Sequence, residues 1–300
     1  MNIITKLLCS AACLAATSVS AKDLEVTHWW TSGGEAAAVS TLAKAFNEKT
    51  DHNWIDGAIA GGGGTSIPAI ISRIIGGEPM GATQLNHGRQ AQELIEAGMM
   101  TDLTEIAEAQ GWRDIVNPVS LLDSCTVDGR VYCVPVNIHS AQWLWVSHGA
   151  FEKAGLAIPK NWDEFVAGSA ELEKNGIVPL AMGQQGWQQS IAFGALVLGV
   201  VGVDKFLEVT GDKNAEVAAG PEWTRAFQSV ANARELARKS KVQDWNLATN
   251  MVITDTAGGQ IMGDWAQGEF QVAGEVAGVD YSCLPGMGFN EILDTGGDAF

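Results

Sequence analysis

The sequence predicts an α/β protein with two lobes, and three observations support this fold class. The chain has 300 residues, more than one hydrophobic core usually serves, so two lobes are expected. Short apolar segments of alternating pattern precede longer segments of helical period, as in α/β folds. Aromatic, acidic and amide residues follow several of the short segments, at the strand ends where open α/β sheets hold their ligands.

The composition and the charge narrow the class of partner. Hydrophobic residues make up 46% and charged residues 18% of the chain, as in folded globular proteins. The 18 Lys plus Arg stand against 35 Asp plus Glu, a net charge of -17, which argues against nucleic acid, other polyanions and anionic membranes as partners. The chain has 11 Trp but 2 Tyr, and this excess of indole rings favours carbohydrate binding.

The N-terminus is predicted to be a secretory signal peptide over residues 1–21. Lys6 precedes an apolar run over 7–16, and residues 19–21 form a small-x-small cleavage site. The mature chain would begin at Lys22 and be exported. No later stretch reaches the roughly 20 uninterrupted apolar residues that a membrane-spanning helix needs.

The first element of the mature chain is a strand predicted over 24–27, which leads into Trp29 and Trp30. The chain then turns through two glycines and begins a helix at Glu35, predicted to run to residue 50. An indole face packs on the apolar face of a pyranose ring, and a carboxylate accepts hydrogen bonds from neighbouring hydroxyl groups. This strand end predicts a sugar site. The alternative is that the tryptophans belong to the core, as one of two adjacent strand residues normally does.

A loop of four glycines at 61–64 is predicted to lie beside the binding cleft. The helix after it is expected to be capped at Thr65 and Ser66, to hold Pro68 in its first turn and to end at residue 75. A phosphate-binding loop would need a Gly-Lys-Ser/Thr ending, which is missing here. Further helices are predicted over 90–97 and 104–110.

Gln84 and Asn86 stand at alternate positions at the end of a short strand predicted over 80–84. Alternate side chains of a strand point the same way, and amide groups both donate to and accept from hydroxyl groups. Both residues are therefore candidate sugar ligands. The alternative is a polar turn with a helix cap.

Cys125 and Cys133 are predicted to form a disulfide. They flank residues 128–130 symmetrically, and a hairpin with a three-residue turn would bring them together across two strands. An oxidising compartment allows the bond. Metal binding is the alternative, although the sequence lacks further ligands at zinc spacing. Cys283 is expected to be a buried thiol without an internal partner.

A stiff strand at 134–139 is predicted to cross between the lobes. His139 within it is a candidate ligand residue, metal ligand or structural histidine. The second half then begins with a strand over 143–146, and its other predicted elements are a strand over 178–182 and helices over 161–174, 190–200 and 222–240.

Three tryptophans of the second half differ in their predicted roles. Trp162 follows the helix cap Asn161, with Glu164 in the capping-box position, so Trp162 is expected to be structural. Trp265 follows an apolar strand end beside glycines, and Trp245 closes the helical region before it. Trp265 thus stands at a strand end, as Trp29 and Trp30 do.

Taken together, these features resemble the periplasmic sugar-binding proteins of ABC transporters, within their glucose- and mannose-binding branch. Trp-Trp-x-x-Gly-Gly-Glu at 29–35 and Pro-Val-Asn-Ile-His at 135–139 are typical of the branch. Pro-Lys-Asn-Trp-Asp-Glu-Phe at 159–165 and Met-Gly-Asp-Trp at 262–265 are typical of the wider family.

The resemblance implies two α/β lobes that are joined by crossing strands and close on a sugar by a hinge. The implied parts are the signal peptide at 1–21, an N-terminal lobe at 22–137, a C-terminal lobe at 138–295 and the start of a return crossing at 296–300. The family chain continues further, so a C-terminal truncation is expected. The implied sugar ligands are Trp29, Trp30, Glu35, Gln84, Asn86, Trp245, Trp265 and Asp298, and the family usually has histidine where Asn86 stands.

The implied function is that of a receptor rather than an enzyme. A monomer would capture glucose or a related hexose without metal or cofactor, and would deliver it to the membrane permease of an ABC importer. One alternative is a secreted glycoside hydrolase that uses Glu35 with Asp264 or Asp298 as its acid and base pair. Another is a binding protein for an oligosaccharide, an amino acid or a metal.

Overall fold

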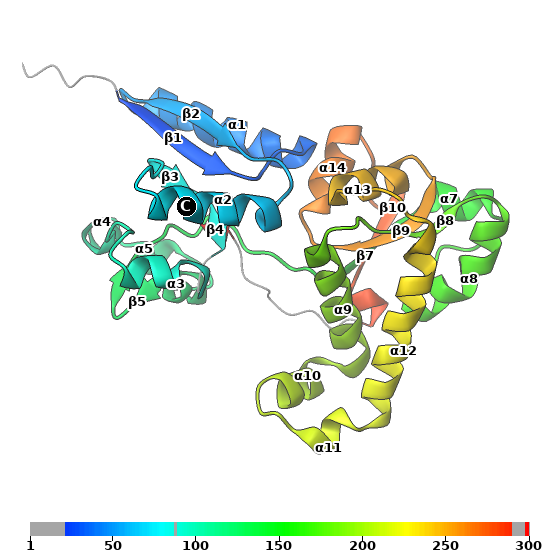
Figure 1. The fold of residues 1–300 in the computed structure, drawn as a ribbon. Helices are drawn as coiled ribbons and strands as arrows, with labels where there is room; N and C mark the ends of the chain where they lie inside the picture. The colour runs from blue at the N-terminus through cyan, green and yellow to red at the C-terminus, as the bar shows by residue number, and fades with distance from the viewer. Residues whose placement is uncertain (1–21, 87–88, 290–297, 300) are drawn as a thin grey trace, which may run out of the picture.

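The N-terminal lobe is built on a parallel sheet of order β2-β1-β3 (Figure 1). The structure is a computed structural model that describes residues 22–86, 89–289 and 298–299, so the predicted signal peptide lies outside the described residues. Strand β1 (Asp23–His28) lies between β2 (Asn53–Ala58) and β3 (Ala82–Thr83). The strand predicted over 24–27 is confirmed as the central strand of this sheet.

Two helices follow the strands of this sheet. Helix α1 (Gly33–Lys49) begins two residues before its predicted start and ends one residue before its predicted end, and α2 (Gly63–Ile75) begins two residues before the predicted cap. Gly62 makes the turn with a φ of 69°, which suits glycine, and Ser66 Oγ donates to its carbonyl at 3.1 Å. Pro68 therefore stands inside α2, and its predicted place in the first turn is wrong.

An ion pair ties α2 to the central strand. Arg73 Nη1 and Nη2 donate to the two carboxylate oxygens of Glu25 at 2.6 and 2.9 Å, and these hydrogen bonds lower the pKa of Glu25. Because the folded pKa is lowered, the pair stabilises the fold above the ordinary Glu pKa of about 4.3 and is lost as the pH falls through the folded value.

Glu25→Gln is therefore expected to lower the thermal midpoint slightly at pH 7 and to leave it unchanged in acid below the folded pKa. The effect is small because both side chains are more than one third exposed. Thermal melts across this pH range check the prediction. Glu48→Gln, which removes an exposed ion pair of α1 with 3.9 Å between its atoms, is the control and should change nothing. An equal effect of Glu25→Gln at both pH values would contradict the account.

The remainder of the N-terminal lobe is made of short elements. Strands β5 (Thr126–Val127) and β6 (Arg130–Val131) form the predicted hairpin, and the Cys125–Cys133 disulfide is confirmed. The turn has two residues rather than three, because Val127 pairs with Arg130 while Asp128 and Gly129 take positive φ angles of 50° and 78°. The other elements are β4 (Leu85–Asn86), α3 (Arg89–Glu96), α4 (Thr104–Ala109), α5 (Trp112–Ile115) and α6 (Ser120–Ser124).

The C-terminal lobe contains a mixed sheet of order β10-β7-β9-β8. Strand β9 (Ala257–Met262) is buried along its whole length, antiparallel to β7 (Trp143–Ser147) and parallel to β8 (Val178–Ala181). Strand β10 (Tyr281–Pro285) pairs with the other edge of β7. The helices around the sheet are α7 (His148–Lys153), α8 (Trp162–Lys174), α9 (Gly186–Val201), α10 (Val203–Thr210), α11 (Ala215–Ala218), α12 (Pro221–Leu236), α13 (Trp245–Ile253) and α14 (Ala266–Ala273), with short 3-10 turns at Ala237–Lys239 and Gly286–Gly288.

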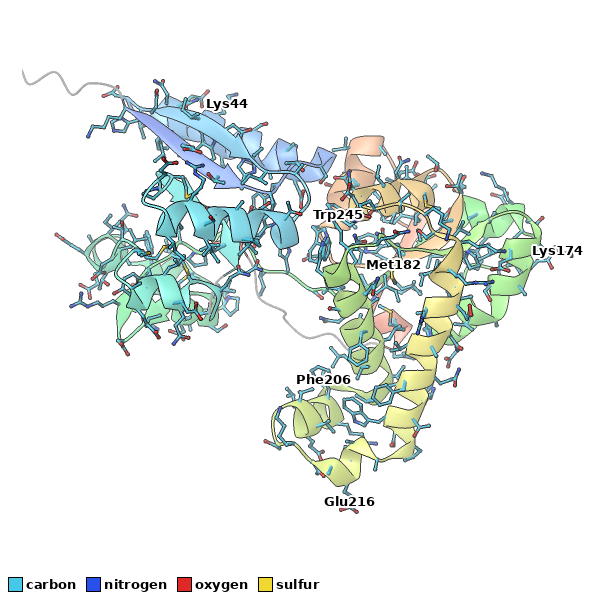
Figure 2. The ribbon with its side chains drawn as sticks, viewed as in Figure 1. Lys44, Lys174, Met182, Phe206, Glu216 and Trp245 are labelled. Carbon is cyan, nitrogen blue, oxygen red and sulfur yellow. A yellow bond between two sulfur atoms is a disulfide. The ribbon has the colours of Figure 1, made fainter. Side chains whose placement is uncertain are left out.

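The largest hydrophobic core cluster of the described residues lies in the C-terminal lobe, whose side chains are drawn in Figure 2. Asn161 Oδ1 accepts the Glu164 N–H at 2.9 Å, which confirms the predicted cap of α8. Trp162 is fully buried, so its structural role is confirmed. Helix α9 begins four residues before its predicted start, and α13 was not predicted.

Two connections join the lobes. Residues 132–142 run from β6 to β7 outside the named strands, so the predicted crossing segment is not a strand of either sheet. On the return, β11 (Asp298–Ala299) pairs antiparallel with β4, and Asp298 lies opposite Asn86. Within the described part of the chain, no single helix has the length and apolar character to cross a membrane, and only the bent pair α9 and α10 passes that test together.

Candidate ligand-binding cleft

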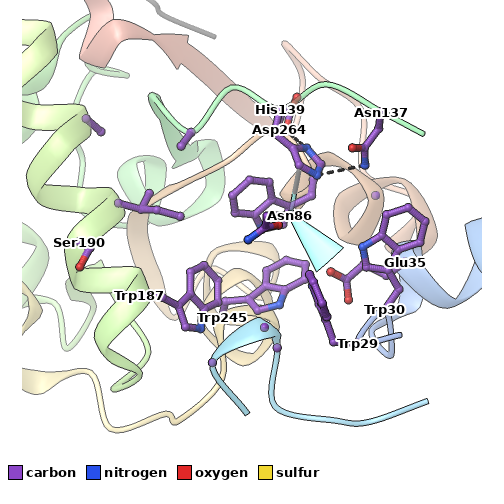
Figure 3. Close-up of a pocket in the computed structure, with 18 of the residues that line it drawn as sticks. Trp29, Trp30, Glu35, Asn86, Asn137, His139, Trp187, Ser190, Trp245 and Asp264 are labelled. Atoms are coloured by element: carbon purple, nitrogen blue, oxygen red, sulfur yellow. Dashed lines mark hydrogen bonds and ion pairs between the residues drawn. The ribbon is translucent and has the colours of Figure 1, made fainter. Parts of the chain in front are cut away.

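A cleft of about 1290 Å³ lies between the two lobes. Its N-terminal wall comes from the end of β1 and the first turns of α1 and α2, and its C-terminal wall comes from α9, the start of α13 and the segment between β9 and α14. Figure 3 shows aromatic rings from both walls with polar side chains among them. Six of the eight predicted ligand residues line this cleft: Trp29, Trp30, Glu35, Asn86, Trp245 and Trp265.

The N-terminal wall presents Trp29, Trp30 and Glu35 together (Figure 3). Trp29 is half-buried, and Trp30 is 8% exposed. The Glu35 carboxylate accepts the hydroxyl of Ser32 at 3.0 Å, so it caps the first turn of α1 while it faces the cleft. The strand end and the helix start thus place indole faces beside a fixed carboxylate.

The two predicted amides are separated by the structure. Asn86 lines the cleft, whereas Gln84 is fully buried and does not line it. Gln84 lies between β3 and β4, and its N–H donates to the Thr27 carbonyl at 2.8 Å. Gln84 Oε1 accepts the Trp29 N–H at 3.1 Å, and its Nε2 is buried without a hydrogen-bond partner among the described residues.

The C-terminal wall contains a tryptophan that the sequence reading did not assign to the site. Trp187 lies beside Trp265, with 6.3 Å between the ring centroids, and its Nε1 donates to Gln185 Oε1 at 2.9 Å. Trp245, from the first turn of α13, is 7% exposed. The Gln-Gln-Gly-Trp-Gln run at 184–188 could have indicated a polar and aromatic binding segment. Its position in the cleft wall depends on how α9 packs, which the sequence pattern does not give.

His139 also belongs to the cleft wall. Its Nδ1 lies 2.9 Å from Asp264 Oδ1, and its Nε2 lies 3.1 Å from Asn137 Nδ2. Because the Asn137 amide donates to Nε2, the ring proton sits on Nδ1 and is donated to Asp264. The ring meets Trp265 edge to face, with 4.9 Å between centroids. His139 therefore supports the Trp265 indole, which its sequence position alone could not show.

Direct contacts between the lobes flank the cleft. The Gly34 N–H at the start of α1 donates to Glu269 Oε1 of α14 at 2.9 Å. A Cβ atom at Gly34 would come within 2.7 Å of Gly268 Cα, so the two helices meet through glycine. Gln185 Nε2 donates to the Gly61 carbonyl at 3.1 Å, which places the predicted glycine loop at the edge of the cleft.

The charges in the cleft are acidic. Among the described residues, its lining includes the carboxylates of Glu35 and Asp264 but no Lys or Arg. No group of three or more His, Cys, Asp and Glu suited to a metal ion occurs in the described part of the chain. Asp298 is described only through its backbone pairing with Asn86, so its predicted ligand role stays a prediction.

Comparisons with known proteins agree with this architecture. The sequence profile of the bacterial extracellular solute-binding proteins matches residues 30–285. A probable sugar-binding periplasmic protein of Rhizobium meliloti is 37% identical over 278 residues, which cover 92% of this chain and 66% of that protein. A protein of the same description from Brucella melitensis is 36% identical over 281 residues, 93% of this chain and 66% of that protein. The chain thus spans about two thirds of the length of these relatives.

Solved structures match the fold at low sequence identity. A chitin oligosaccharide binding protein superposes with a TM-score of 0.70 at 16% identity, over 92% of this chain and 72% of that one. A solute-binding protein of Thermotoga lettingae bound with α-D-tagatose gives a TM-score of 0.67 at 18% identity, over 93% and 72%. These likenesses confirm the predicted two-lobed α/β fold.

Proposed function

Because the chain belongs to the family of bacterial extracellular solute-binding proteins, we propose that it is a periplasmic receptor that captures a sugar between its lobes for an ABC importer. The relatives described as probable sugar-binding periplasmic proteins support both the ligand class and the location. The placement in the glucose- and mannose-binding branch is part of this proposal and comes from the sequence patterns alone.

The observation that carries the proposal is the make-up of the cleft. Indole rings from both lobes, Trp29 and Trp30 opposite Trp187, Trp245 and Trp265, share it with two carboxylates. Aromatic faces bind the apolar face of a sugar ring, and carboxylates accept its hydroxyl hydrogens. Each polar contact contributes only about 0.5 to 1.5 kcal/mol, so several must form together to reach micromolar affinity, about -8 kcal/mol.

A receptor mechanism follows from the position of the cleft between two lobes. Sugar bound to one wall is enclosed when the other wall approaches, so binding shifts the population toward the arrangement in which the lobes touch. The permease would recognise that arrangement. In the cleft, Asp264 is held by His139 and by the Ser140 N–H at 3.3 Å, which fixes the position of this carboxylate in the cleft wall.

The proposed ligand is a monosaccharide, glucose or a related hexose, bound by a monomer. An oligosaccharide is the second candidate, because the cleft of about 1290 Å³ continues along α9 past Ser190, Ala195 and Leu198, further than one sugar ring needs. The tagatose and chitin oligosaccharide proteins show that both ligand sizes occur on this fold.

Isothermal titration with glucose, mannose, galactose, xylose and maltose tests the proposal. Micromolar binding of glucose with weaker binding of its epimers is expected, whereas tighter binding of maltose would favour the oligosaccharide. Glucuronate should bind at least tenfold more weakly than glucose, because its carboxylate would enter a cleft lined by Glu35 and Asp264. If none of these sugars binds, the proposal of a sugar receptor is refuted. Turnover of an aryl glycoside would favour the hydrolase.

A further inference from the structure

The turn that carries Trp29 and Trp30 begins where the sheet ends. The last backbone hydrogen bonds between β1 and its neighbouring segments are made by two carbonyl groups. The His28 carbonyl accepts the Ile59 N–H at 2.8 Å, and the Thr27 carbonyl accepts the Gln84 N–H at 2.8 Å. Beyond these bonds the chain leaves the sheet. The N–H groups of the two tryptophans therefore need partners from outside the ladder.

Two buried side chains supply those partners. Gln84 Oε1 accepts the Trp29 N–H at 3.1 Å, and His28 Nδ1 accepts the Trp30 N–H at 3.2 Å. Gln84 is 0% and His28 is 1% exposed, so water does not replace either acceptor. Leaving a buried N–H unpaired is costly, and the turn is thereby held to one backbone conformation.

The acceptor role of His28 depends on its tautomer. Its Nε2 lies 2.5 Å from Oδ1 of Asp56 on the neighbouring strand β2. With the proton on Nε2 and donated to Asp56, Nδ1 is left with the lone pair that accepts the Trp30 N–H. The carboxylate on one side and the backbone N–H on the other select the same tautomer.

We propose that His28 is a positioning residue of the sugar site, which holds the Trp30 backbone through Nδ1 while Asp56 fixes its tautomer. His28 does not line the cleft, so it acts on sugar through the turn it fixes. Trp29, Trp30 and, five residues further, Glu35 all depend on where this turn leaves the sheet. The proposal rests on the proposed sugar-binding function.

Two substitutions of His28 distinguish the role of its hydrogen-bond acceptor from the role of its ring volume. His28→Phe keeps a planar ring but removes the acceptor, and it should weaken binding of D-glucose and D-mannose at least tenfold. His28→Asn supplies an oxygen that can accept the N–H two residues ahead, as in an Asx turn, and it should restore affinity to within about threefold of the wild type. Titration calorimetry of each full-length variant measures both.

A histidine of the other lobe provides the matched control. His148 also uses both ring nitrogens, with Nδ1 2.8 Å from the Val279 carbonyl and Nε2 2.6 Å from Ser282 Oγ, but it does not line the cleft. His148→Phe should lower the thermal midpoint without changing sugar affinity. An equal loss of affinity in the two Phe variants would overturn the proposal, as would full affinity in His28→Phe or no rescue by His28→Asn.

The exposed partner Asp56 gives a second route if His28→Phe does not fold. Its side chain is 59% exposed, so Asp56→Ala should fold. Without the carboxylate, the His28 proton is no longer held on Nε2, and sugar binding should weaken about threefold. Unchanged affinity in Asp56→Ala would then overturn the proposal. Failure of the wild type to bind any sugar of the panel would instead refute the proposed function, so the two failures are distinguishable.

Discussion

Gly268→Val is expected to weaken sugar binding about thirtyfold, although Gly268 is a glycine and offers the ligand no side chain. A Cβ atom at this position would come within 3.0 Å of Gly34 Cα in the other lobe. Overpacking of this kind costs about 1 to 3 kcal/mol. It destabilises only the arrangement in which the lobes touch. The measured dissociation constant rises as that arrangement becomes rarer.

Small-angle scattering with and without sugar provides a readout specific to closure. The wild type should contract when sugar is added, and Gly268→Val should contract less at the same sugar concentration. Gly186→Val is the control, since nothing lies within 4 Å of a Cβ atom built at Gly186, and it should bind and contract as the wild type does. Normal affinity and normal contraction of Gly268→Val would show that the glycine contact plays no part in closure.

The contact at Gly268 also involves the N-terminal end of α1. The neighbouring Glu269 accepts the Gly34 N–H at 2.9 Å, where the helix dipole favours negative charge. Glu35 follows directly on the same turn and lines the cleft. The contact between the lobes and the proposed sugar ligand Glu35 thus lie on one helical turn.

The parts of the site that the sequence could predict are those fixed by neighbours in the chain. Trp29, Trp30 and Glu35 follow one strand closely in the chain, so their common place on the cleft wall could be expected. The distant residues Gln84 and Asp56 hold this turn but do not decide which residues it carries. The Cys125–Cys133 disulfide was predictable for the same reason, since only eight positions separate the two residues.

The parts that could not be predicted depend on distant segments. His139 and Asp264 are 125 positions apart in the sequence but form a hydrogen bond. No local sequence pattern predicts a contact over such a separation. Gln84 lies between β3 and β4, and its side chain bonds the Trp29 N–H instead of lining the cleft, a contact across 55 positions that no local pattern could show. Helix α13 was missed because Asn, Thr and Val within it are weak helix formers; burial of Ala248 and Val252 against the core stabilises it instead.

Glu35→Ala is expected to weaken glucose binding about thirtyfold, which is the loss of about 2 kcal/mol that a charge-assisted hydrogen-bond acceptor contributes. The same substitution removes a cap of α1, because Glu35 Oε2 accepts the hydroxyl of Ser32 at 3.0 Å. A cap contributes about 1 kcal/mol to stability, so the thermal midpoint without ligand should fall by only a few degrees.

Ser32→Ala separates these two roles, because it removes the same cap and leaves the carboxylate in the cleft. Both variants should lose a similar few degrees in thermal melts, while titration calorimetry should find glucose affinity within threefold of the wild type in Ser32→Ala alone. Equal losses of affinity would mean that Glu35 acts through the helix rather than through the sugar.

The epimers make the test of Glu35 sharper. A carboxylate that accepts two neighbouring hydroxyl groups discriminates against a sugar in which one of them is inverted, since the buried acceptor is then left unpaired. Glu35→Ala should therefore lose more affinity for glucose than for its weaker-binding epimers. The ratio of each epimer's dissociation constant to that of glucose should then move toward one. A uniform loss across the panel would assign Glu35 a general electrostatic effect, and the reading of individual hydroxyl groups would then have to come from Asn86 or Asp264.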